Sequence, residues 1–168
     1  SAPAGLTYEV SGTDVQVSWD ASTDDHTPQQ GLGYNLRMGT TEGNMDIFSA
    51  LANLSTGYRR VVSTGNASQN TSWVIDSLAF GQYYASVQAL DHNYAGSAFS
   101  ATLAIEVVPL ATFSVVDSIC IFDQATITYT GNASPAAQYD WDFDGATVIS
   151  GSGQGPYVVF WHQAGLKT

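Results

Sequence analysis

Positive charge is scarce in this chain of 168 residues, which has 4 Lys and Arg side chains against 15 Asp and Glu side chains. The formal net charge of -11 repels phosphate backbones, so we expect no nucleic-acid partner. A surface of this sign also repels anionic membranes. It leaves open a purely solubilising role, cation binding, or a neutral, sugar-like partner.

Long apolar runs are also missing, although hydrophobic residues make up 44% of the chain. No stretch reaches the roughly 18 consecutive apolar residues of a membrane-crossing helix, so we expect no membrane insertion. The segment from Ser1 to Gly5 lacks the charged and apolar regions of a signal peptide. It reads as a linker, as though the chain begins partway through a larger protein.

Cysteine is nearly absent, because Cys120 is the single one. It could be a buried core residue, or half of a disulfide whose partner is missing from the sequence. No group of Cys and His has the spacing of a zinc site.

The usual catalytic motifs are missing as well. The chain has no G-x-S-x-G elbow, and its histidines, at positions 26, 92 and 162, lie near expected loops or strand ends. The glycines at 151, 153 and 155 are followed by no helical pattern that would offer an N-terminus to a phosphate. We therefore expect a non-enzymatic protein with no catalytic residues and no organic cofactor.

Helical periodicity is nearly absent, and apolar residues instead alternate with polar ones. The exception is the stretch from Met45 to Leu54, where Ile47, Leu51 and Leu54 could share a face of a short turn or helix. Elsewhere short alternating runs are separated by polar, glycine-containing turns, which predicts an all-β fold of the sandwich type. The apolar positions of these runs are Val15, Val17 and Trp19; Tyr34, Leu36 and Met38; Trp73 and Ile75; and Tyr83, Ala85, Val87 and Ala89.

A break at residues 107–110 divides the chain. Pro109 cannot donate a ladder hydrogen bond, so it ends the first series of strands. A second series is expected at 112–116, 125–129, 139–143, 147–149 and 157–161. We therefore predict two tandem immunoglobulin-like β-sandwiches, residues 1-109 and residues 110-168.

The first unit resembles a fibronectin type III domain over residues 3–108. The resemblance lies in "VQVSW" with Trp19, in "GYNLRMGT", and in "LAFGQYYASVQALD", which has the pattern of the family's tyrosine-corner strand. Parity with Val87 assigns Tyr83 as the corner tyrosine. The subtype is similar to modules of large secreted bacterial proteins, although fibronectin modules have no single function.

The second unit resembles a PKD domain, another immunoglobulin-like sandwich, because "YDWDFDGA" is similar to the family's Y-x-W-D-F-G-D-G. It departs from the pattern in having DFDGA for DFGDG, and the sequence stops at Thr168, where the family's last two strands should begin. The resemblance therefore implies a truncated second sandwich that lacks its last strands. It also implies that Cys120 pairs with a cysteine beyond Thr168.

The motif "DWDFDG" also fits the opening of a calcium loop. On a strand, however, Asp140, Asp142 and Asp144 would point one way at spacings of roughly 6.6 Å, too far apart to wrap one ion. The twelfth position, which needs a bidentate acid, is Gly151. The motif therefore predicts a strand rather than an ion site.

Acidic residues gather at one expected end of the first sandwich. Asp24 and Asp25 lie in the loop after its second strand, and Asp91 ends the corner strand, which reaches the same end. Oxygen ligands in loops suit calcium, so Asp24, Asp25 and Asp91 are the candidate metal ligands. The alternative is that these acids cap turns through bonds to nearby backbone amides.

Several residues could carry or contact sugars. Asn-x-Ser patterns start at Asn53, Asn66, Asn70 and Asn132, and Asp76-Ser77-Leu78 and Asp117-Ser118-Ile119 resemble a bacterial O-glycan acceptor. Ordinary turn chemistry explains the same residues. Tyr84 and Tyr94 should lie off the core face, where they could stack on sugar rings or cover neighbouring side chains.

The sequence predicts a non-catalytic structural or adhesive part of a larger secreted or cell-surface bacterial protein. Its modules would act as spacers or protein-interaction domains, with other domains of the same polypeptide or surface proteins as partners. The alternative is a set of accessory, carbohydrate-binding domains of an extracellular hydrolase.

Overall fold

The structure is a computed structural model that describes residues 1–53 and 56–167. The chain divides into two compact units, Ser1–Val108 and Pro109–Thr168, and each unit has its own cluster of buried apolar side chains. Apart from one short 3-10 helix, η1 (Gln29–Gly31), every regular element described is a strand, which confirms the all-β prediction. Over the described ranges, no helix has the length and apolar character that crossing a membrane requires.

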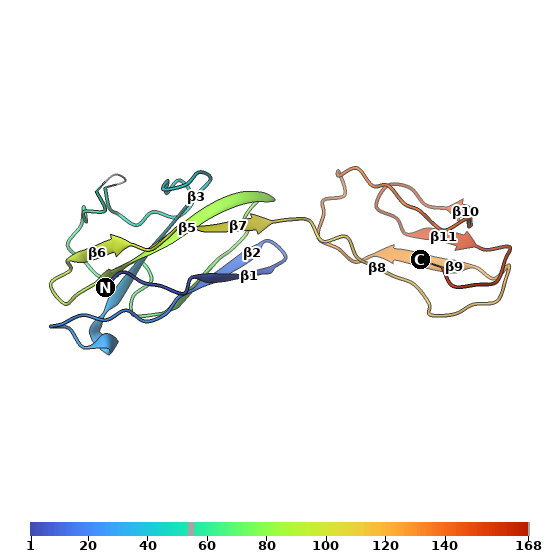
Figure 1. The fold of residues 1–168 in the computed structure, drawn as a ribbon. Helices are drawn as coiled ribbons and strands as arrows, with labels where there is room; N and C mark the ends of the chain where they lie inside the picture. Colours follow the sequence, from blue (N-terminus) through green and yellow to red (C-terminus); the bar gives the residue numbers. More distant parts are fainter. Residues whose placement is uncertain (54–55, 168) are drawn as a thin grey trace. The chain divides into compact units, whose positions relative to one another are not determined.

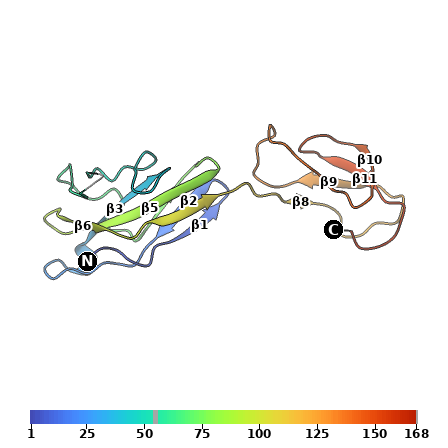
Figure 2. The same ribbon diagram turned by 45° about the horizontal axis from the view of Figure 1, so that its top comes forward.

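The first unit is a sandwich of two antiparallel sheets. Figures 1 and 2 show β1 and β2 in one layer and β3, β5 and β6 in the other. The first sheet has the order β1-β2-β4, and consists of β1 (Thr7–Ser11), β2 (Asp14–Ser18) and β4 (Ser72–Ile75). The second has the order β3-β5-β6, with β7 also paired to β5, and consists of β3 (Gly33–Gly39), β5 (Gly81–Leu90), β6 (Gly96–Phe99) and β7 (Leu103–Val107).

The core of the first unit is formed by the alternating apolar positions of these strands. Val15 and Val17 of β2, Leu36 and Met38 of β3, and Val87 of β5 are all 0% exposed. Trp19 is 5% exposed, and its ring meets the Tyr34 ring edge-on at 5.7 Å between centroids. The prediction that Trp19 lies inside the first core is therefore confirmed.

The long connection between β3 and β4 covers the free edge of β3. The side-chain amide of Asn66 makes the two hydrogen bonds that a neighbouring strand would make there. It accepts from the Leu36 amide at 2.8 Å and donates to the Leu36 carbonyl at 2.7 Å. The backbone amide of Tyr34 donates to the Ser68 carbonyl at 2.7 Å, and the Tyr34 carbonyl accepts from the Ala67 amide at 3.1 Å. An edge that would otherwise expose unpaired backbone groups is thus satisfied.

The short helix expected from Met45 onward is absent over residues 45–53, and Leu54 lies outside the described residues. Phe48 instead exchanges two backbone hydrogen bonds with Met38, each 2.9 Å long. Its ring packs against Trp73 at 6.2 Å between centroids. Pairing with β3 satisfies these backbone groups and places the half-buried Phe48 ring against Trp73.

The second unit contains one antiparallel sheet of order β10-β11-β9-β8. Its strands are β8 (Phe113–Ser114), β9 (Ala125–Tyr129), β10 (Thr147–Ser150) and β11 (Tyr157–Phe160). The strand expected over 112–116 is therefore reduced to two residues. Ala125, Ile127 and Val159 are the buried apolar residues, and partly buried aromatic rings pack around them.

The strand expected over 139–143 is not formed. The segment packs its aromatic side chains against the buried cluster of the sheet instead of pairing with one of its strands. The alternation of this segment is nevertheless preserved, because Asp140, Asp142 and Asp144 are exposed and the aromatic residues between them pack inward. Trp141 and Phe143 stack at 5.7 Å with 10° between their planes, and both pack against Tyr157 within the second core.

Candidate functional site

Tyr83 forms the tyrosine corner that the sequence pattern assigns to it. Its hydroxyl donates to the Ala79 carbonyl at 2.8 Å, four residues upstream, and the side chain is 5% exposed. Because the ring fills the core while the hydroxyl holds the preceding turn, this residue serves the fold rather than a ligand.

Two of the candidate calcium ligands, Asp24 and Asp91, accept hydrogen bonds from backbone amides. Asp24 accepts through Oδ2 from the Thr27 amide at 2.9 Å and from the His26 amide at 3.2 Å. These bonds, the one from Thr27 first, hold the pKa of the exposed Asp24 carboxyl below its ordinary value. Asp91 accepts through Oδ1 from the amides of Asn93 and Ala95, both at 2.8 Å.

The structure brings these acids only partly together. Potential ligand atoms of Asp24, Asp25 and His26 lie within 4.8 Å of one another, all on exposed side chains, and Asp25 Oδ1 is 2.8 Å from His26 Nδ1. Asp91 is outside that group, although Asp24 and Asp91 line the same hollow of about 180 Å³. The geometry matches the turn-capping alternative, and calcium binding by Asp24, Asp25 and Asp91 stays the other alternative, to be tested by experiment.

The other two histidines contact threonine hydroxyls. His92 Nδ1 lies 2.8 Å from Thr27 Oγ1 and joins the turn after β5 to the loop after β2. His162 Nε2 lies 3.1 Å from Thr147 Oγ1 and joins the end of β11 to β10. The first contact therefore joins two loops of the first unit, and the second joins a loop residue to a strand of the second unit.

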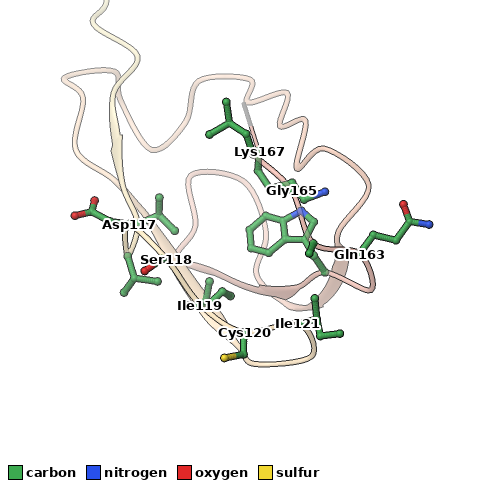
Figure 3. Close-up of a pocket in the computed structure, with 14 residues that line it drawn as sticks. Asp117, Ser118, Ile119, Cys120, Ile121, Gln163, Gly165 and Lys167 are labelled. Carbon is green, nitrogen blue, oxygen red and sulfur yellow. The ribbon is translucent and has the colours of Figure 1, made fainter.

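A groove of about 580 Å³ opens beside the core of the second unit (Figure 3). The groove is lined by residues 115–121, by Ala125, and by Trp161 with residues 163–167. The lining exposes apolar side chains, among them Val116 at 55% and Ile121 at 48%. Cys120 is exposed, so the buried-core alternative for this residue is wrong, and its sulfur points away from Lys167 in the view of Figure 3.

Several of the candidate glycan acceptors have structural contacts, among them Asn53, which accepts from the Thr56 amide at 3.0 Å. Asn66 donates both to the Leu36 carbonyl and to the Ser49 carbonyl, and Asn132 accepts from the Leu110 amide. Ser77 has a φ of 57° in a turn, and its amide donates to Asp14 Oδ1 at 2.8 Å. Asn53 and Ser77 fit the turn-chemistry alternative, whereas Asn66 and Asn132 bond to segments distant in the sequence. Glycosylation at these positions stays a prediction.

A second hollow, on the first unit, was not anticipated from the sequence as a site. We call it the tyrosine hollow: it measures about 420 Å³ and is lined by residues 56–59 and 94–98. Tyr94 is one of the two tyrosines expected off the core face, and it is 39% exposed here, whereas Tyr84 is half-buried outside this lining. No pattern links the two walls, because they come from separate loops that only the fold brings together.

No family model matches the chain, and no curated protein matches its sequence. Among solved structures, the crystal structure of chicken CNTN1 FN1-FN3 domains is similar, with a TM-score of 0.42 and 15% sequence identity. The match covers 77% of this chain and 42% of that chain, so the chain spans less than half of that structure. At this TM-score and identity the match supports no assignment of residues or function.

Proposed function

We propose that the chain supplies non-catalytic structural or interaction modules to a larger extracellular or cell-surface protein, with the first unit a fibronectin type III module. The observation that carries this proposal is the presence of two compact units with separate cores, in which buried or capping polar groups hold loops in place. Tyr83, Asn35 and Gln88 are examples, because each hydrogen-bonds within its own unit. Modules of this kind set distances between neighbouring domains or offer surfaces to partners.

We further propose that the second unit is a PKD-like module. The support is the packing of its "DWDFDG" motif, in which Trp141 and Phe143 face the sheet while Asp142 and Asp144 stay exposed. Asp142 accepts from the Asp144 amide at 2.9 Å, so the acids shape a turn instead of lining a catalytic cleft.

A module exchange in the parent protein tests the role. Residues 1–168 are replaced by two unrelated β-sandwich modules of similar length, and surface display and partner binding are measured on intact cells. Retained function supports a spacer role, and loss of binding with normal display supports an interaction role. An antibody against the first unit should label intact cells, and labelling only after permeabilisation would contradict the extracellular location.

Catalysis is tested on the purified chain with chromogenic ester, peptide and glycoside substrates. We expect no turnover above that of the heat-denatured protein. Turnover that co-purifies with the chain would overturn the non-catalytic proposal.

A further inference from the structure

The groove of the second unit leaves apolar side chains open to water (Figure 3). We call it the apolar groove, and its lining is residues 115–121, Ala125, Trp161 and residues 163–167. Val116 is 55% exposed and Leu166 is 90% exposed, although both belong to a lining that reaches the buried Ala125. An apolar surface that stays exposed beside a core is typical of an interaction site.

The backbone of the lining segments is also unpaired. Residues 115–119 make no backbone hydrogen bond to any other described residue, and the same holds for residues 163–167. The sequence from Val115 to Ile121, VVDSICI, is rich in β-branched residues, which favour strands. This segment therefore has the side chains of a strand, and its amides and carbonyls lack a neighbouring strand with which to pair.

The edge of β9 is open next to the apolar groove. Thr130 donates to the Thr112 carbonyl at 2.8 Å, and Thr128 is paired with the last residue of β8. Because every second residue of an antiparallel strand faces the same neighbour, Thr126 is the next residue of β9 that faces this side. Since β8 has already ended, Thr126 has no strand opposite it there among the described residues. Its neighbour Ala125 lines the apolar groove.

An extended peptide strand matches both features of the apolar groove. Its side chains cover the apolar lining, and its backbone pairs with the unpaired amides and carbonyls, as in β-strand addition. An acyl chain would cover the side chains but leave the backbone groups without partners. Because alternate side chains of a strand lie on one face, apolar residues of the bound strand should alternate with polar ones.

Charge restricts the sequence of that strand. The net charge of the chain is -11, and the second unit has aspartates at positions 117, 123, 140, 142 and 144 against one cation, Lys167. A second copy of the chain has the same negative charge, which opposes self-association. Asp117 is exposed in the lining, so it attracts a lysine at the end of the bound strand and repels an acidic residue.

We propose that the apolar groove binds an extended strand of a partner protein, in which valine or isoleucine alternates with threonine or serine and lysine flanks the run. The strand lies along residues 115–121 and pairs with their free backbone groups. This proposal rests on the interaction role proposed above, and it names the chemistry of the partner. Its failure would leave the spacer role standing, because setting a distance between domains requires no occupied groove.

The first test compares short peptides that differ in one property each. The reference peptide alternates valine with threonine between two lysines, and the purified chain is titrated with it by calorimetry and NMR. We expect the amide signals of residues 115–121 and 163–167 to shift and those of β2 and β3 to stay unchanged. N-methylation of alternate peptide amides keeps the side chains and removes the donors, so it should weaken binding at least about tenfold. Exchanging the two lysines for glutamates should weaken binding at least about threefold.

The second test compares matched variants of two exposed valines in the second unit. Val116 lies in the apolar groove, whereas Val148, which is 44% exposed, lies on β10 outside the lining. Substitutions at exposed positions usually change stability little, so Val116→Asn and Val148→Asn should have similar melting temperatures. We expect Val116→Asn to weaken binding of the reference peptide at least about fivefold and Val148→Asn to weaken it by less than about twofold.

Four results of these titrations would overturn the proposal. They are no binding of the reference peptide up to about 1 mM, equal binding of the N-methylated or glutamate-flanked peptide, equal losses at Val116 and Val148, and displacement of the peptide by dodecanoate. Sedimentation of the chain without peptide gives one more. Dimers that Val116→Asn disperses would show that a second copy, and not a partner strand, occupies the apolar groove.

Discussion

Asn35 donates through Nδ2 to Gln88 Oε1 at 3.3 Å, and both side chains are 1% exposed. The pair lies on neighbouring strands, where Asn35 of β3 is directly opposite Gln88 of β5. Asn35 also donates to the Ala50 carbonyl, and Gln88 donates to the Gly57 and Ser97 carbonyls. Two buried amides thus anchor the long β3–β4 connection and the β6 strand to the outer face of the sheet.

Replacing Gln88 with Met should destabilise the first unit. The substitution keeps much of the volume but leaves the Gly57 and Ser97 carbonyls without this donor, and each buried group left unsatisfied costs about 1–3 kcal/mol. We expect a loss of about 2–4 kcal/mol in urea unfolding, together with faster proteolysis within residues 50–60. Gln82→Met, at the exposed start of β5, is the control, and an equal loss there would contradict the role of the buried pair.

The hydroxyl of Tyr83 should stabilise the fold through its bond to Ala79. Tyr83→Phe keeps the ring in the core and removes one hydrogen bond, which typically contributes about 0.5–1.5 kcal/mol. Tyr84→Phe on the opposite face of β5 should change stability by less than about 0.5 kcal/mol. Thermal unfolding of the two variants under the same conditions is the measurement. Equal losses of unfolding free energy would show that the bond from Tyr83 to Ala79 contributes nothing.

The inner faces of the sheets could be predicted from the sequence because the pleat ties burial to every second position. Val15, Val17 and Tyr83 follow this rule, and so does Trp141, although its segment is not a strand. The outer face could not be predicted in the same way. Asn35 and Gln88 occupy positions that alternation assigns to solvent, and they are buried only because the β3–β4 connection lies over them.

The structure differs from the sequence-based predictions, or goes beyond them, where contacts between segments distant in the sequence determine the local structure. The strand expected at 139–143 is not formed, and the aromatic residues of this segment pack against Ala125, Ile127 and Val159, which are distant from it in the sequence. The tyrosine hollow joins Arg59 to Tyr94 through loops whose closeness depends on Gln88. The sequence predicts Asp24 and Asp91 at one end of the sandwich, and both line one hollow, because the order of the strands in this fold determines which loops lie at the same end.

The carboxylate of Asp24 should make the stability of the first unit dependent on pH. Amide bonds from Thr27 and His26 lower its folded pKa, so its contribution is present above the unfolded pKa and is lost as the pH falls through the folded value. Asp24→Asn keeps an acceptor oxygen and removes the charge. We expect the wild-type advantage over this variant to shrink below the ordinary aspartate pKa of about 3.9.

The measurement is urea unfolding of wild type and Asp24→Asn between neutral and strongly acidic pH. Asp140→Asn removes the same formal charge from the second unit and controls for overall charge. A difference between wild type and Asp24→Asn that stays constant across this range would show that the amide bonds do not favour the ionised carboxylate.

Calcium should have little effect on the melting temperature. The oxygens Asp24 Oδ2 and Asp91 Oδ1 each accept two amide hydrogen bonds, so a cation would compete with bonds already formed. Calorimetry with millimolar calcium and with chelator is the measurement. Binding to the folded state at 100 times its Kd would add about 2.7 kcal/mol, so a clear rise abolished by Asp25→Asn and Asp91→Asn would favour the calcium alternative.

The two cores should respond to core mutations independently. Leu36 is 0% exposed in the first cluster and Ile127 is 6% exposed in the second, and no residue belongs to both clusters. Truncation of either to Ala removes buried apolar volume at a cost of about 2–5 kcal/mol. Leu36→Ala should therefore speed hydrogen exchange of the β3 and β5 amides and leave β9 and β11 unchanged, whereas Ile127→Ala should do the reverse.

Because the second cluster has fewer buried apolar residues, its most protected amides should also open at lower free energy in the wild-type chain. A single transition in which either mutation accelerates all of these strands together would show that the chain unfolds as one cooperative unit.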